Sequence, residues 1–174
     1  GRDIGFIFQE PMTALNPLKT IGEQVSEVIR IHKKINKYDA LNSAAKILDR
    51  VGLPQNDFPL TKYPFELSGG QRQRVVIAMA LALKPKLIIA DEPSTALDVT
   101  TQAKLIKLLK KLVIEDNICL IMITHDLSVI AEMADKIIIM RNGVIVERGK
   151  INILKNRLKN DYSKNLLKAS NYKS

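Results

Sequence analysis

The 174-residue sequence contains one cysteine and 46% hydrophobic residues, which excludes a disulfide scaffold and a largely disordered chain and predicts a globular core. No run approaches about 18 apolar residues and no signal peptide is visible, so we expect no membrane-spanning helix and a reducing compartment. The net charge of +9 suits an anionic partner, but only 5% of residues are aromatic and the lysines are spread out, as at Lys104, Lys107 and Lys111, so we expect solvated lysines and no nucleic-acid partner.

The first half of the chain reads as one strand followed by helices. Residues 4–8 (IGFIF) form an apolar run that predicts a buried strand, and residues 9–19 contain two prolines, which favours a loop. Gly52 is expected to end one helix, and Ser68 is expected to cap the start of another, buried helix. The predicted helices span residues 20–32, 39–51 and 68–83.

The second half of the chain alternates strands and helices. Apolar runs predict strands at residues 87–90, 119–123, 136–140 and 144–147. Amphipathic stretches predict helices at residues 100–113, 127–134 and 163–169. The alternation between residues 87 and 140 predicts a parallel sheet with helical crossovers, and Asn142-Gly143 predicts a hairpin turn.

Polar residues that suit phosphate chemistry follow two of these apolar runs. Asp91 and Glu92 follow one run, and Thr124 and His125 follow the next. Because ligands of parallel sheets bind beyond the carboxyl ends of the strands, we expect these residues to share one site. Asp91 could hold Mg²⁺ through its water shell, and Glu92 could be free to accept a proton from an attacking water. His125 could donate a hydrogen bond to a phosphate; a solvated turn and a structural histidine are the alternatives.

Two further features could add ligand-binding groups. Ser68-Gly69-Gly70 opens a helix, and the amides and dipole of a helix start can bind an anion, although the same residues also suit a simple helix cap. Gln9 follows the first strand, and its amide could coordinate Mg²⁺ or hold a water. A glutamine at a strand end can equally have no such role.

The sequence contains no GxxxxGK[ST] motif, which is the loop that holds phosphates in P-loop ATPases. Phosphoryl transfer needs a metal, a water-positioning base and donors around the γ-phosphate, and these residues carry only part of that set. We therefore expect this chain not to hydrolyse ATP unaided. Because Gly1 is not methionine, we expect a processed chain or a piece of a longer protein. A sheet without its phosphate-loop strand should expose apolar surface and be poorly stable.

Five motifs in order resemble those of the ATP-binding subunits of ABC transporters, and the resemblance covers nearly the whole chain. LSGGQRQR (67–74) matches the signature, LIIADEP (87–93) matches Walker B, STALD (94–98) matches the D-loop and ITHD (123–126) matches the switch-histidine loop. Gln9 matches the glutamine of the Q-loop. The resemblance implies an α/β fold: an incomplete P-loop NTPase domain of the ABC ATPase type, with a parallel-sheet core, an inserted helical subdomain, and a C-terminal hairpin and helical tail.

The resemblance also implies roles for individual residues. Glu92, His125 and Gln9 would be catalytic, and Asp91 and Gln9 would hold Mg²⁺. Contacts to ATP or across the interface with a second domain would come from Ser68, Gly69, Gly70, Gln71 and Asp98.

FQEPMTALNPLKTIGEQ (8–24) and KNDYSKNLL (159–167) are similar to the dipeptide and oligopeptide importer branch. This likeness implies an ATP-hydrolysing subunit at the cytoplasmic face of the cell membrane that powers peptide import with ATP and Mg²⁺. The implied partners are a second ABC ATPase domain, identical or different, the membrane permease subunits and, indirectly, a peptide-binding protein. The two ATPase domains would face each other head to tail, and residues 12–17 would lie near the permease.

The expected divisions are a strand leading into the Q-loop (1–9), a helical signature subdomain (10–85), the Walker B and switch part of the core (86–149) and a C-terminal tail (150–174). Two other functions stay open. One is a non-catalytic truncated partner that supplies the signature and D-loop in trans. The other is a soluble ABC ATPase of DNA repair or translation, which the Q-loop and the tail disfavour.

Overall fold

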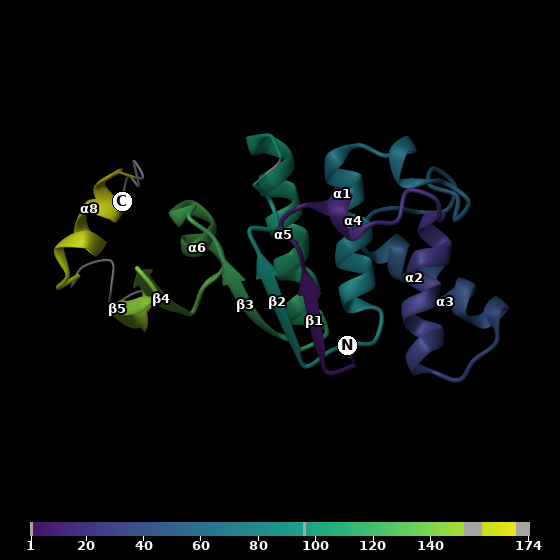
Figure 1. The fold of residues 1–174 in the computed structure, drawn as a ribbon, viewed down its shortest axis with the longest axis horizontal. Coiled ribbons are helices and arrows are strands. Elements are labelled where there is room, and N and C mark those ends of the chain that lie inside the picture. Colours follow the sequence, from purple (N-terminus) through teal and green to yellow (C-terminus); the bar gives the residue numbers. More distant parts are fainter. Residues whose placement is uncertain (1, 96, 152–157, 170–174) are drawn as a thin grey trace. The chain divides into compact units, whose positions relative to one another are not determined.

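The computed structural model describes residues 2–95, 97–151 and 158–169 (Figure 1). The chain divides into two compact units, Gly1–Ile123 and Thr124–Ser174. Among the described helices, none combines the length and the apolar character that crossing a membrane requires.

The first unit is a three-stranded sheet with helices. Its elements are β1 (Ile4–Ile7), α1 (Pro11–Ala14), α2 (Ile21–His32), α3 (Lys37–Arg50), η1 (Pro64–Glu66), α4 (Gly69–Leu81), β2 (Leu87–Asp91), α5 (Val99–Glu115) and β3 (Cys119–Ile123). The strand order is β1-β2-β3 and both pairings are parallel. The register aligns Phe6 with Ile89 and Ile121, so these three side chains share one face of the sheet.

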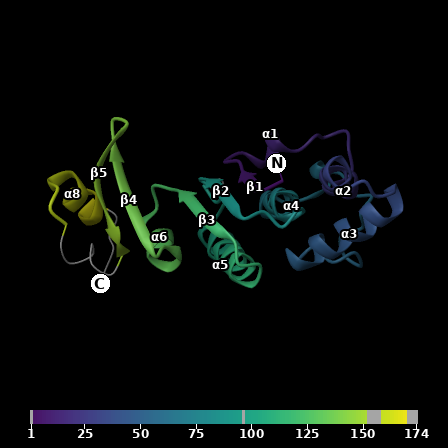
Figure 2. The ribbon, with the colours of Figure 1, turned by 90° about the horizontal axis from the view of Figure 1, so that it is seen from below.

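The two faces of this sheet differ in burial. On one face Ile7, Ile88 and Ala90 are fully buried, and α4 and α5 lie on that side (Figure 2). On the other face large apolar side chains are 40–53% exposed: Ile4, Phe6, Phe8, Ile121 and Ile123. The prediction that residues 4–8 and 119–123 form buried strands is therefore wrong for this face. The continuous apolar runs are typical of strands covered on both sides, whereas the described residues cover only one side.

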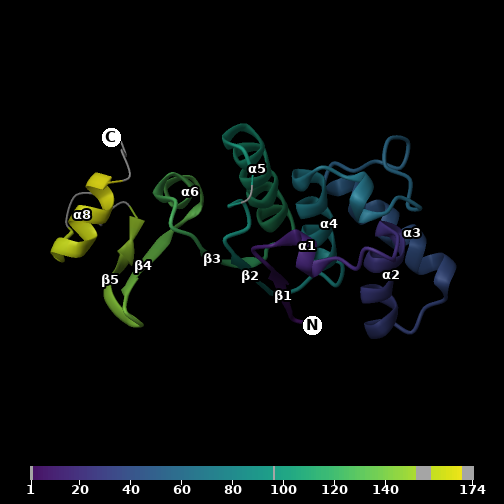
Figure 3. The same ribbon diagram turned by 45° about the horizontal axis from the view of Figure 1, so that its top comes forward.

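The helical region lies beside the sheet, with α4 between the sheet and the α2–α3 pair (Figure 3). The α2 helix begins one residue after its predicted start because Thr20 is the cap, and the Thr20 side chain accepts a bond from the Glu23 amide. The α3 helix begins two residues earlier than predicted because Asn36 caps it. It ends at Arg50, one residue before the predicted end, and Gly52, the predicted stop, has a φ of +77°. Residues 9–19, predicted as a loop, contain the one-turn helix α1, since Pro11 has a φ suited to a first helical position.

The second unit contains α6 (Leu127–Met133), β4 (Lys136–Arg141), β5 (Val144–Lys150) and α8 (Asp161–Ala169). Asn142 and Gly143 both have positive φ, which gives the predicted hairpin between β4 and β5. The expectation that residues 136–140 extend the parallel sheet is wrong, because β4 pairs antiparallel with β5 in a separate two-stranded sheet.

The C-terminal helix α8 matches the predicted helical tail and contacts the hairpin. The amide of Lys159 donates to Oε1 of Glu147 at 2.8 Å, and the guanidinium of Arg141 lies 4.8 Å from the ring centre of Tyr162. The hydrogen bond from the Lys159 amide holds the pKa of Glu147 below its usual value. These contacts attach the tail to β4 and β5.

Candidate functional site

The turn after β2 holds Glu92 in a conformation that is uncommon for a residue with a side chain. Asp91 is the last residue of β2, as predicted, and Glu92 follows with a φ of +42°. The amide of Glu92 donates to the carbonyl of Ile123 at 2.9 Å, and the amide of Thr95 donates to the carbonyl of Glu92 at 3.3 Å. A left-handed non-glycine residue costs about 1–2 kcal/mol, so the neighbouring strand and turn must hold it there.

The Glu92 carboxylate accepts a hydrogen bond from Gln9, a residue far from it in the sequence. Nε2 of Gln9 donates to Oε2 of Glu92 at 3.0 Å, and the hydroxyl of Thr95 donates to the same oxygen at 2.9 Å. The structure thus brings Gln9 and Glu92 together, although 83 positions separate them. Gln9 and Thr95 therefore orient the Glu92 carboxylate, and its role as a proton acceptor stays a prediction. Sequence reasoning missed Thr95, although STALD contains it.

The start of α4 is built by its own sequence. The hydroxyl of Ser68 accepts a bond from the Gln71 amide at 3.3 Å, and Oε1 of Gln71 accepts one from the Ser68 amide at 2.8 Å. This reciprocal capping box confirms Ser68 as the cap. It also occupies the Gln71 side chain, for which the resemblance had implied a ligand contact. Gly69 and Gly70 lie in the first turn, where amides have no partner within a helix.

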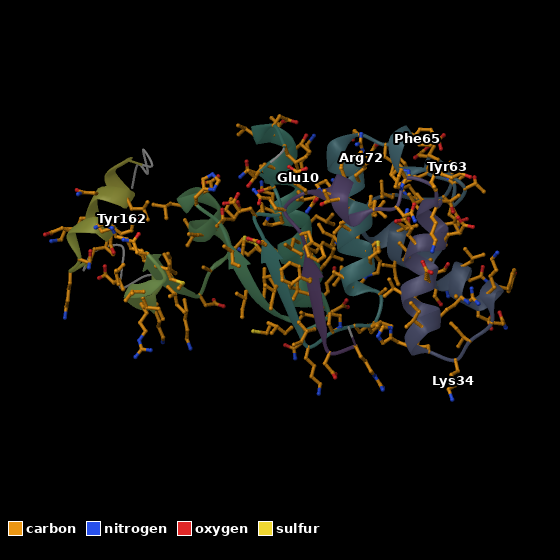
Figure 4. The ribbon with its side chains drawn as sticks, in the orientation of Figure 1. Glu10, Lys34, Tyr63, Phe65, Arg72 and Tyr162 are labelled. Carbon is orange, nitrogen blue, oxygen red and sulfur yellow. The ribbon has the colours of Figure 1, made fainter. Side chains whose placement is uncertain are left out.

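Two arginines in the first half of α4 donate hydrogen bonds to backbone carbonyls outside the helix. Nε of Arg72 donates to the carbonyl of Leu67 at 2.9 Å, and its guanidinium also contacts the sulfur of Met12 in α1. Nη1 of Arg74 donates to the carbonyl of Val51 at 2.7 Å, and burial lowers the pKa of Arg74. Figure 4 shows Arg72 at the end of the helical region where α4 begins, with Tyr63 and Phe65, and Lys34 at the opposite end.

Asp98 has a structural role that the sequence reasoning did not identify. It is the N-cap of α5, and its Oδ1 accepts bonds from the amides of Thr100 and Thr101 at 3.1 and 3.0 Å. The hydroxyl of Thr100 donates to the same oxygen. These bonds hold the pKa of Asp98 well below its usual range, and the bond from the Thr100 hydroxyl has the largest effect. An Asp at the start of an amphipathic stretch, as in Asp98-Val99-Thr100-Thr101, could have predicted this cap.

Thr124 and His125 follow β3 along the chain and belong to the second unit. The hydroxyl of Thr124 accepts a bond from the Asp126 amide at 3.0 Å, and His125 is exposed. Their grouping with Asp91 and Glu92 stays a prediction.

A parallel sheet has Asp91 and Glu92 at its carboxyl edge, Gln9 bonded to Glu92, and a helix that begins with a capped Ser-Gly-Gly. These features are typical of α/β proteins that bind a phosphate-bearing ligand at the carboxyl ends of their strands. Comparison with known proteins narrows this class. The family model described as ABC transporter matches residues 1–95, more than half of the chain. The chain therefore belongs to the ABC transporter family, and the recognition made from its motifs is confirmed.

Curated relatives and solved structures agree with this assignment. The chain is 47% identical over 169 residues to the glutathione import ATP-binding protein GsiA of Salmonella choleraesuis (strain SC-B67), covering 97% of this chain and 27% of GsiA. A putative peptide import ATP-binding protein, BMEII0863 of Brucella melitensis, is also 47% identical over 97% of this chain and 50% of its own length. The chain thus spans half or less of the length of these relatives.

Among solved structures, the chain resembles the ATP-binding cassette MJ0796, determined as a dimer in a post-hydrolysis state bound to ADP and Pi. The TM-score is 0.72 at 36% identity, over 86% of this chain and 63% of that chain. This likeness confirms the predicted α/β ABC ATPase fold.

Proposed function

We propose that this chain is part of the ATP-binding subunit of an ABC importer for peptides, and that it contributes the water-activating and signature parts of the ATPase. The observation that carries the proposal is the hydrogen bond from Gln9 to Glu92, which joins two motif residues beyond the carboxyl ends of neighbouring parallel strands. The names of the relatives from Salmonella and Brucella, which import glutathione and peptides, support the substrate class.

Glu92 is the proposed general base. Its carboxylate is oriented by Gln9 and Thr95, and orientation of the base toward a bound water is a requirement of proton transfer. Because the oriented oxygen accepts two hydrogen bonds, rotation of the side chain away from the site is restricted. His125 is the proposed donor to the γ-phosphate.

The residues near Glu92 fit Mg²⁺ bound together with a nucleotide. The described residues contain no group of three or more His, Cys, Asp or Glu side chains that could hold a metal by themselves. Mg²⁺ commonly uses one or two protein oxygens and takes its other ligands from phosphates and water, so Asp91 and Gln9 are the proposed ligands. The bound ion would neutralise charge on the phosphates.

A second ATPase domain is the proposed partner for the start of α4. Ser68, Gly69, Gly70 and Gln71 would face a nucleotide held by that domain, and Asp98 would contact it across the interface. That MJ0796 forms a dimer bound to ADP and Pi supports a second ATPase domain as the partner. The other proposed partners are membrane permease subunits and, indirectly, a peptide-binding protein, which would place the protein at the cytoplasmic face of the cell membrane. The divisions at residues 9, 85 and 149 remain part of the proposal.

The test of the proposed base is Glu92→Gln in the full-length protein. Glutamine keeps the size of the side chain but cannot take the proton, so ATP turnover should fall by at least about 100-fold while ATP binding persists. Steady-state hydrolysis and equilibrium binding of ATP measure the two effects. Normal turnover in the variant would remove Glu92 as the base.

The isolated 174-residue chain offers a second test. It lacks the GxxxxGK[ST] loop that supplies most phosphate donors, so it should bind ATP weakly and not hydrolyse it. Calorimetric titration with Mg²⁺-ATP measures this directly. Sub-micromolar affinity of this chain for ATP would contradict the role given to that loop.

A further inference from the structure

The starts of α4 and α5 contact each other through a glycine and a threonine. A methyl group at Gly70 would lie 2.6 Å from Cγ2 of Thr101, which is closer than real carbon atoms approach. The same group at Gly69 would lie 3.6 Å from Cδ2 of Leu97, an ordinary contact. The methyl of Thr101 therefore occupies the space that any side chain at residue 70 would need, and packing restricts residue 70 more than residue 69.

Thr101 is itself held firmly. Its amide donates to Oδ1 of Asp98 at 3.0 Å, which ties the Thr101 backbone to the cap of α5. A threonine in a helix has only two common rotamers, so the position of its backbone limits where the Thr101 methyl can lie. Asp98, Thr101 and Gly70 thus form one connected contact between the D-loop and the signature helix.

We propose that Thr101 is a positioning residue, whose methyl group sets where the first-turn amides of α4 lie relative to the Asp98 loop. The ligand of those amides is the phosphate of a nucleotide held by a second domain, so this inference rests on the proposed function. Through this contact, the two segments that would face the second domain move as one body. Neither the motif resemblance nor the relatives' names assign a role to Thr101.

The proposal can be tested in the full-length protein by adding a methyl group at Gly70 and removing one from Thr101. Gly70→Ala should displace α4 and lower kcat for ATP hydrolysis by about 10-fold, because coupled neighbours commonly interact with energies worth that factor. Thr101→Ser removes Cγ2 and keeps the hydroxyl, so the double variant regains the missing space. It should recover turnover to within about 3-fold of the wild type. The matched control Gly70→Ala/Thr100→Ser removes a methyl from the exposed Thr100 and should not recover turnover.

Hydrogen exchange of the Gln71 amide, which donates to the Ser68 hydroxyl in the first turn of α4, gives a readout that does not depend on turnover. Thr101→Ser should speed this exchange several-fold, whereas Thr101→Val, which keeps the methyl and loses the hydroxyl, should not. This pair leaves Gly70 unchanged, so it remains informative if Gly70→Ala does not fold.

The outcomes separate this inference from the proposed function. If the wild-type protein does not hydrolyse ATP, the proposed function fails, and the exchange rates still decide the role of Thr101. A double variant as impaired as Gly70→Ala would overturn the positioning role, as would exchange that responds to Thr101→Val rather than to Thr101→Ser. Exchange that responds to Thr101→Ser, together with turnover that the double variant does not recover, would make the contact purely structural and also overturn the proposal.

Discussion

The two faces of the β1-β2-β3 sheet are made from the same strands and have similar apolar content, yet they differ in what covers them. One face carries Ile7 and Ile88, both without solvent exposure, beneath α4 and α5. The other carries Phe6 and Ile121, which are 40% and 49% exposed. The difference shows that the apolar residues of a strand do not by themselves indicate which of its two faces another element covers. Contact with the helices decides burial, and therefore decides which substitutions matter.

The sharpest test of this difference is to remove the same atoms from each face. Ile88→Ala should destabilise the chain by about 2–5 kcal/mol, because it leaves a cavity at a fully buried position. Ile121→Ala, on the neighbouring strand, should cost less than about 1 kcal/mol because its side chain is half in water. Urea denaturation of the 174-residue chain measures both. Equal losses would show that the two faces are not covered differently.

The contact between the buried face and α4 can be tested by adding atoms. A methyl group at Gly5 would lie 2.7 Å from the carbonyl oxygen of Ala80 in α4. Gly5→Ala should therefore push α4 away from β1 and cost about 1–3 kcal/mol. Thermal denaturation followed by circular dichroism would reveal the loss. A variant as stable as the wild type would place α4 farther from β1 than the structure does.

The smallest expected effect on stability concerns Asp98, the cap of α5, which with α4 covers the buried face of the sheet. Because hydrogen bonds lower the pKa of Asp98 in the folded state, its stabilising effect is complete above the unfolded pKa of about 3.9. The effect is lost as the pH falls below that value toward the lower folded pKa. The wild type should therefore lose more stability than Asp98→Asn between about pH 5 and pH 2, since asparagine caps without titrating. Denaturation at several pH values measures this, and parallel curves would contradict it.

Local sequence predicted the start of α4 and the β4–β5 hairpin well. Ser68 and Gln71 are three residues apart, so their capping box needs no other part of the chain. Asn142 and Gly143 similarly form the hairpin turn without contacts from distant parts of the chain. The conformation of Glu92 could not be predicted this way, because it depends on Ile123 and on Gln9, which lie far from it in the sequence.

By itself, the sequence determined the class of the protein, the order of its motifs and nearly all of its helices and strands, because caps, turns and apolar periodicity act over a few residues. Only the tertiary structure decided the remaining features. It set the Gln9 amide against the Glu92 carboxylate and the Thr101 methyl against Gly70, and the residues that the structure describes cover only one face of the sheet. Each of these depends on segments that meet only when the chain folds, and no local pattern records which segments will meet.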